Sequence, residues 1–147
     1  MKIKVKRFEE LTTSELYEIL RCRAEVFIVG QHCNYQDIDG ADKASTHIYF
    51  EEDGSILAYL RVIDPGVKFP AASIGRVLTM NEFRSHGLAR KLMLEGISVA
   101  QKLSDTIEIE AQSYLVDFYR SLGFRETSEE YLIDGLPHIS MVLNISK

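Results

Sequence analysis

The hydrophobic residues of this chain recur at two spacings, and each spacing predicts a different kind of element. Alternation of apolar and polar residues, or a short run of β-branched and aromatic side chains, predicts a strand. On this basis we expect strands at residues 2–7, 46–51, 56–63, 72–80, 106–111, 130–133 and 139–145. The dipeptides Asp53-Gly54 and Asp134-Gly135 separate two pairs of these strands, and such dipeptides favour tight hairpin turns.

Apolar residues three and four positions apart predict three helices. The first begins at the capping box Thr12-x-x-Glu15, in which each side chain can bond the other residue's backbone N–H, and it should end near Gly30. The second covers residues 88–103, where Gly96 would let the helix pack closely on a sheet. The third covers residues 114–122, and Gly123 is suited to cap its C-terminus.

The order of these elements predicts a single domain over residues 1–147. It runs as a strand, one or two helices, three strands, a helix, a strand, a helix and two strands. This order indicates an α/β protein with a mixed sheet covered by helices on both faces. No linker-like, repetitive or low-complexity segment divides the chain, and 147 residues suffice to bury a core without disulfides.

Charge and composition narrow the surroundings and partners that we expect. With 22 acidic against 17 basic residues the formal net charge is −5, which disfavours a nucleic-acid surface. No apolar run approaches the roughly 20 residues of a membrane span, and the N-terminal segment lacks the apolar core of a signal peptide. We therefore expect a cytoplasmic protein without a membrane partner, in which Cys22 and Cys33 are free thiols. An exposed final strand could pair across a homodimer.

The loop from Arg84 to Arg90 joins the predicted strand 72–80 to the predicted helix 88–103. Backbone N–H groups at the start of a helix lack partners, and such a place can bind phosphate oxygens. Gly87 and Ala89 would allow the backbone to approach a ligand closely, and the two arginines would add positive charge. Neither the dinucleotide motif G-x-G-x-x-G nor the P-loop motif is present. The loop is therefore either an anion site of another kind or an ordinary strand-to-helix turn.

Three segments of the chain resemble the GNAT superfamily of acyl-CoA-dependent N-acetyltransferases. Arg84-x-x-Gly87-x-Ala89 is similar to the superfamily's Q/R-x-x-G-x-G/A signature. The segment from Gln112 to Tyr119, followed by Leu122-Gly123-Phe124, resembles its second motif. Arg23-x-x-x-Phe27-x-Val29-x-Gln31, with Tyr35-Gln36-Asp37-Ile38-Asp39, is similar to the ElaA-type branch of small bacterial acetyltransferases. The resemblance implies the GNAT fold, with a mixed and mostly antiparallel sheet.

Two residues depart from the pattern of that family. Gln112 stands where Asn is common, and either amide can hold the pantetheine arm of coenzyme A. Gly30 stands where the ElaA-type pattern usually has Glu, so any acid or base duty of that Glu is absent here or moved. The resemblance implies an acetyl-CoA-dependent N-acetyltransferase. The Gly30 departure keeps a non-catalytic acyl-CoA-binding or sensing domain open, and a structural partner protein without a ligand is a third alternative.

The resemblance also implies where acetyl-CoA would bind. The strand from Gly75 to Met80 would be splayed from its neighbour, so that its backbone could pair with the pantetheine arm and polarise the acetyl carbonyl. The loop from Arg84 to Arg90 would take the pyrophosphate. The cofactor-binding residues implied in this way are Val77, Leu78, Thr79, Arg84, Ser85, His86, Gly87, Leu88, Ala89, Arg90, Gln112 and Tyr119.

Direct attack of an amine on the thioester, within a ternary complex, requires an acid and a base. Tyr119 is the candidate acid, because the pKa of tyrosine, about 10, is close to the pKa of a thiol, about 8.5. Its alternative role is aromatic packing. His138 is the first candidate base, since the resemblance places a histidine there opposite the acetyl group, and His47 is the second. A water chain that ends at a carboxylate remains a third route.

The acceptor, a small-molecule amine or a protein N-terminus or lysine, is expected near the acidic loop. Asp37 and Asp39 could receive a cationic amine, although a solvated loop would need no ligand. A pocket role for Arg23 follows from the resemblance, and His47 joins these residues as a substrate-binding candidate.

We expect no metal site. Asp37-x-Asp39-Gly40 resembles part of an EF-hand loop, but that register puts Tyr35 first and Thr46 twelfth, where calcium needs carboxylates. Cys22, His32 and Cys33 lack a second ligand pair at zinc spacing.

Overall fold

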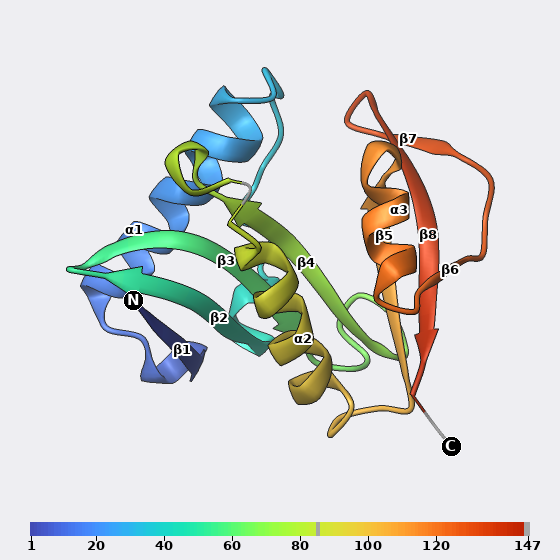
Figure 1. Cartoon of the computed structure of the whole chain (residues 1–147), viewed down its shortest axis with the longest axis horizontal. Helices are drawn as coiled ribbons and strands as arrows, with labels where there is room; N and C mark the ends of the chain where they lie inside the picture. Colours follow the sequence, from blue (N-terminus) through green and yellow to red (C-terminus); the bar gives the residue numbers. More distant parts are fainter. Residues whose placement is uncertain (85, 146–147) are drawn as a thin grey trace.

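The structure, a computed structural model, describes residues 1–84 and 86–145 as one mixed sheet with helices on both of its faces (Figure 1). The strand order is β1-β2-β3-β4-β5-β8-β6, and β7 pairs with β8. Among the strand pairs of the described residues, β4–β5 alone is parallel. The strands are β1 (Lys2–Arg7), β2 (Ser45–Glu52), β3 (Ser55–Ile63), β4 (Ala72–Thr79), β5 (Thr106–Gln112), β6 (Arg125–Glu126), β7 (Tyr131–Ile133) and β8 (Leu136–Asn144). The predicted fold class is confirmed.

The sheet is covered by α1 (Thr13–Arg23) on one face and by α2 (Leu88–Ala100) and α3 (Val116–Ser121) on the other (Figure 1). The side chains of β2 and β3 alternate between the faces, as the period of a strand requires. Ile48 and Leu60 are buried in the cluster under α2 and α3, whereas Tyr49 and Tyr59 are buried in the cluster under α1. At Gly96, an added Cβ would lie 3.3 Å from Leu60 and Ile74, so glycine does allow the predicted close packing.

The turn and cap signals in the sequence are confirmed. The Thr12 hydroxyl accepts a hydrogen bond from Glu15 N, while the Glu15 carboxylate accepts one from Thr12 N. In both predicted hairpin turns the two central residues have positive φ, at 51° and 81° for Asp53-Gly54 and at 50° and 80° for Asp134-Gly135. Two successive positive φ angles define the type I′ turn, which matches the twist of paired strands.

The first helix differs from the prediction at its C-terminal end. The α-helix ends at Arg23 and continues as a π-helix, η2 (Ala24–Val29). Gly30 N donates to Glu25 O at 2.7 Å, five residues back, which is the hydrogen-bond spacing of a π-helix. The predicted third helix begins with a 3₁₀ turn, η5 (Ser113–Leu115), before α3, and the two-residue strand β6 is too short for a periodic pattern to reveal.

Strands β4 and β5 separate soon after they meet. They pair only at Ala72 with Ile107 and at Ser73 with Glu108. On its other side, β4 changes register against β3 between Tyr59 and Arg61, where Arg76 adopts a φ of +51°. Such an extra residue bends a strand. The backbone of β4 beyond Ser73 is therefore free of a strand partner on the β5 side, as expected from the family resemblance.

Other 3₁₀ turns are η1 (Phe8–Glu10), η3 (Ala41–Ala44) and η4 (Asn81–Phe83). Within the described part of the chain, no helix is both long and apolar enough to cross a membrane.

Candidate active site

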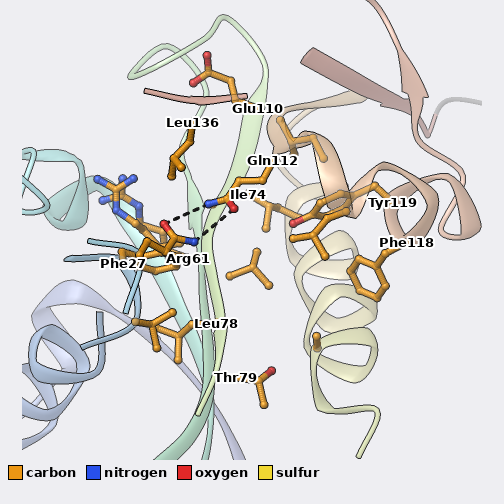
Figure 2. Close-up of a pocket in the computed structure, with 18 of the residues that line it drawn as sticks. Phe27, Arg61, Ile74, Leu78, Thr79, Glu110, Gln112, Phe118, Tyr119 and Leu136 are labelled. Atoms are coloured by element: carbon orange, nitrogen blue, oxygen red, sulfur yellow. Dashed lines mark hydrogen bonds between the residues drawn. The ribbon is translucent and has the colours of Figure 1, made fainter. Parts of the chain in front are cut away.

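A cavity of about 800 Å³ lies where β4 and β5 separate. Its walls come from β4, the start of α2, β5, α3, η2 and the turn between β7 and β8 (Figure 2). The sequence-predicted residues that line it are Val77, Leu78, Thr79, Arg84, Gly87, Leu88, Ala89, Arg90, Gln112, Tyr119 and His138. The structure therefore brings most of the candidate cofactor residues, and both first-choice catalytic candidates, to one cavity.

One end of this cavity is the start of α2. Gly87 is the N-cap residue with a φ of +74°, a conformation that glycine adopts without strain. The N–H groups of Leu88, Ala89 and Arg90 lie in the first turn, where an α-helix supplies no partner. These residues fit a diphosphate group. His86 is exposed and does not line the cavity, and Ser85 lies outside the described residues.

The two arginines of this loop also contact neighbouring elements. Arg84 Nε donates to the Thr79 carbonyl oxygen at 3.1 Å, which ties the loop to the end of β4. Arg90 Nη1 donates to Ser121 Oγ at 3.0 Å, which ties α2 to α3. Each guanidinium has five N–H donors, so these single bonds leave donors for an anion.

Tyr119 projects from α3 with its hydroxyl toward the cavity (Figure 2). Its ring packs edge-on against Phe118 and Phe124, at centroid distances of 5.2 and 6.0 Å. Burial raises the pKa of the phenol above its ordinary value, so it is protonated at neutral pH. No described residue forms a hydrogen bond with the hydroxyl. Aromatic packing and a cavity-facing hydroxyl are thus combined in one residue.

Gln112, which Figure 2 shows in the wall of the cavity, is hydrogen-bonded to Gln31, which also lines it. Gln31 Nε2 donates to Gln112 Oε1 at 3.3 Å, and Gln112 Nε2 donates to Gln31 Oε1 at 3.5 Å. Gln31 follows the π-helix, so this amide pair joins the acidic-loop side of the molecule to β5. The sequence motif contained Gln31 but gave it no role.

Gly30 is required by the local backbone. An added Cβ would lie 2.8 Å from Val26 O and 3.0 Å from Glu25 O, closer than a real Cβ approaches such atoms. The π-helix therefore has no room here for the Glu that the ElaA-type pattern usually carries.

His138 lies on β8 opposite Gln112 of β5. Its Nδ1 is 2.8 Å from the Leu136 carbonyl oxygen, and its ring stacks on Tyr131 at a centroid distance of 6.5 Å. Because a carbonyl only accepts, the bond assigns the proton to Nδ1 in the neutral ring. Nε2 is then an acceptor, which is the state that a general base needs.

The four predicted substrate-binding residues do not line the cavity. Arg23 is fully buried, and it donates through Nε to Asp37 Oδ2 at 2.9 Å and through Nη1 to Asp42 Oδ1 at 2.6 Å. Arg61 Nη2 donates to Asp39 Oδ2 at 2.6 Å, and its Nη1 donates to Asp42. These ion pairs fasten the acidic loop to the end of α1 through Arg23 and to β3 through Arg61, which is a structural role.

Arg76, the residue of the β4 bulge, also joins this group of charges. Its Nε lies 2.8 Å from Asp37 Oδ1, a close ion pair whose angle does not suit a hydrogen bond. Burial alone would raise the pKa of Asp39 and Asp42, but the bonds and charges of Arg61 and Arg23 outweigh it and hold both below their usual range.

His47 is fully buried with both ring nitrogens occupied. Nδ1 is 2.7 Å from Tyr59 Oη, and Nε2 is 3.0 Å from the Asp42 carbonyl oxygen. Burial lowers its pKa. Neither ring nitrogen is free to contact the amine substrate. The positions of Arg23 and His47 therefore do not support direct contact with the substrate.

Sequence reasoning missed Glu110 and Lys68, which both line the cavity. Glu110 Oε1 is 2.7 Å from Lys68 Nζ, and Oε2 accepts from Tyr131 Oη at 3.0 Å. The period of a strand could have revealed Glu110, because it lies two residues before Gln112 and therefore on the same face of β5.

Known proteins resemble this chain over most of its length. Residues 11–145 match the family model described as acetyltransferase (GNAT) domain. The UPF0039 protein sll0451 of Synechocystis is 36% identical over 142 residues, which cover 95% of this chain and 92% of that protein. Protein ElaA of Escherichia coli is 34% identical over 140 residues, with 92% of each chain covered.

Solved structures agree with these relatives. An acyl-CoA N-acyltransferase from Pseudomonas aeruginosa matches with a TM-score of 0.91 at 37% identity, over 97% of this chain and 99% of that one. The crystal structure of Escherichia coli ElaA matches with a TM-score of 0.91 at 32% identity, over the same shares.

The chain belongs to the GNAT acetyltransferase family, and it is an acyltransferase. Within that family it is similar to the ElaA-type branch. Proteins of the family use acetyl-CoA. In the described ranges, no group of three His, Cys, Asp or Glu side chains is placed to hold a metal ion.

Proposed function

We propose that this protein is an acetyl-CoA-dependent N-acetyltransferase, which moves an acetyl group to an amine by direct attack in a ternary complex. The observation that carries the proposal is the cavity between β4 and β5, which joins the unpaired backbone of β4, the free N–H groups of α2 and the hydroxyl of Tyr119. The amine would be a small molecule or belong to a peptide. We place the reaction in the cytoplasm, without a nucleic-acid or membrane partner. The expectation of an exposed final strand is wrong, because β8 pairs with β5 on one side and with β6 and β7 on the other, so a homodimer would need another surface.

The residues fit coenzyme A in two parts. The backbone of Val77, Leu78 and Thr79 and the amide of Gln112 offer hydrogen-bond partners for the pantetheine arm. The start of α2 offers N–H groups to the pyrophosphate. The cavity-lining residues of that second part are Arg84, Gly87, Leu88, Ala89 and Arg90. Ser85, which lies outside the described residues, and the exposed His86 belong to it only through the family resemblance.

Acetyl-CoA, when bound, supplies the acetyl thioester. Tyr119 holds a proton at Oη within the cavity and donates it to the departing thiolate. Its raised pKa would oppose that transfer if the thiolate were in water. A coenzyme A thiol held in the same buried place would also have a raised pKa, which would restore the match between donor and acceptor.

His138 removes the proton of the amine at Nε2. A primary amine has a pKa near 10, about three units above neutral pH, so its deprotonation costs about 4 kcal/mol unless a base accepts the proton. The Nδ1 bond to Leu136 O holds the ring in the tautomer that accepts.

The test measures thiol release from acetyl-CoA with a panel of amines. We expect Tyr119→Phe to lower kcat by about 10²–10³, since one proton donor contributes about that much, with the KM for acetyl-CoA changed less than about threefold. Tyr17→Phe, an exposed tyrosine of α1, is the matched control. Unchanged kcat in Tyr119→Phe would remove the phenol from the mechanism. Tight cofactor binding without transfer to any amine would instead indicate an acyl-CoA-binding protein.

A further inference from the structure

A primary ammonium group of the chain already lies against a carboxylate in the wall of the cavity. Lys68, in the loop between β3 and β4, places Nζ 2.7 Å from Glu110 Oε1. Both residues line the cavity, and their side chains are 40% and 23% exposed. The ammonium of Lys68 has the same chemistry as a protonated acceptor amine.

Neighbouring side chains hold the Glu110 carboxylate in place and keep it charged. Tyr131 Oη donates to Oε2 at 3.0 Å, and the same hydroxyl lies 2.8 Å from Ser140 Oγ. Burial alone would raise the pKa of Glu110, but the bond and charge of Lys68 and the bond of Tyr131 outweigh it and hold that pKa below its usual value. Glu110 is therefore an anion at neutral pH, with a fixed oxygen toward Lys68.

This carboxylate lies beside the candidate base. In the β5–β8 register Glu110 is opposite Ser140, and Gln112 is opposite His138, so the four side chains share one face. Tyr131 links the two positions, because its ring stacks on His138 while its hydroxyl bonds Glu110. Figure 2 shows Glu110 beyond Gln112, at the end of the view opposite Thr79.

The partner of Glu110 is replaceable. Lys68 is held by this ion pair and by a contact with the Phe69 ring, 5.6 Å from Nζ to the centroid. A pair that is this exposed contributes little to stability, and a lysine side chain can turn to solvent. Tyr131 and Ser140 would stay in place when it does so.

We propose that Glu110 is the docking residue for the acceptor, and that the acceptor is therefore a cationic primary amine whose ammonium displaces Lys68. This inference rests on the proposed function and adds the charge class of the substrate. Glu110 binds and orients the ammonium beside His138, and the proton leaves only when His138 accepts it.

The test compares two acceptors of similar shape. Benzylamine is a cation at neutral pH, whereas aniline is neutral. In Glu110→Gln we expect KM for benzylamine to rise at least about tenfold, with KM for aniline changed less than about twofold. Lys68→Met, which removes the competing ammonium, should lower KM for benzylamine. Glu108→Gln, on the same face of β5 but outside the cavity lining, is the matched control.

A binding measurement separates this inference from the proposed function. Calorimetry with coenzyme A present should show benzylammonium binding to the wild type and at least about tenfold weaker binding to Glu110→Gln. Glutamine keeps the size of Glu110 and an acceptor for Tyr131, and an unchanged melting temperature verifies its fold. Glu110-dependent binding without acetyl transfer would support the docking site and refute the proposed reaction. Equal losses for both acceptors, or no loss for either, would overturn the docking role.

Discussion

Replacing Arg23 by methionine tests whether the buried ion pairs of the acidic loop stabilise the fold. Arg23 is fully buried and donates three hydrogen bonds, to Asp37 Oδ2, to the Asp37 carbonyl oxygen at 2.9 Å and to Asp42 Oδ1. Methionine fills much of the same volume but leaves both carboxylates with fewer partners. Removing one member of a buried ion pair costs about 3–5 kcal/mol of unfolding free energy.

The assay is thermal or urea unfolding followed by circular dichroism. At about 2–4 °C for each kcal/mol in a chain of this size, Arg23→Met should lower Tm by about 6–20 °C. Arg21→Met is the control, because Arg21 is exposed and pairs with Glu18 and Glu25 on the surface of α1. Such surface pairs contribute about 0–1 kcal/mol. Equal changes in Tm for the two substitutions would refute this structural role of the buried ion pairs.

Gly87→Ala forces a residue with a side chain into a φ of +74°, so we expect the free energy of unfolding to fall by about 1 kcal/mol. Calorimetry should also show weaker binding of coenzyme A. Tighter or unchanged binding would contradict the pyrophosphate site at the start of α2. Gly30→Ala places a Cβ 2.8 Å from Val26 O, so we expect a lower Tm than that of the wild type. An equal Tm would show that the backbone of η2 can shift to make room for the methyl group. The folded pKa values of Asp39 and Asp42 are depressed, so their stabilisation is complete above the unfolded value of about 3.9 and is lost as pH falls below it. Unfolding free energies measured from pH 6 to pH 3 should therefore decline at the acid end, and a flat profile would contradict the ion pairs.

The sequence predicted those turns and helix caps that depend on interactions between residues close together in the chain. The two Asp-Gly turns and the Thr12 capping box depend on residues within four positions of one another, and the structure has all three. Successive side chains of a strand point to opposite faces of the sheet, and this period of two indicated the outer strands, whereas β2 and β3 bury both faces and were indicated by their continuous apolar runs. The α2 loop was found in the same way, through Gly87 and the apolar helix after it.

Features that depend on distant residues were not predicted. Arg61 reaches Asp39 and Asp42 across 22 and 19 residues, so nothing in the local pattern of either segment indicates the pair. For the acidic loop the sequence therefore left two interpretations open, a site for a cationic amine and a solvated loop, and it indicated no ion pair with Arg61. The bulge at Arg76 depends on the register of β4 against β3, and no residue type in the sequence indicates it.

At Tyr119 the two roles that the sequence allowed are compatible, although only the aromatic packing is confirmed and proton donation stays a prediction. The motif indicated a proton donor and the neighbouring Phe118 and Phe124 indicated packing, and the ring packs on both while lining the cavity. The Gly30 departure has a physical reason in the π-helix, whose backbone carbonyls fill the space of a side chain.

Titration of isotope-labelled protein with coenzyme A, followed by backbone amide NMR, tests the binding site most directly. The account predicts large shifts of the amides of Val77, Leu78 and Thr79 on β4 and of Leu88 to Arg90 at the start of α2, together with Gln112. Shifts that leave these amides unchanged and gather on another surface would contradict it.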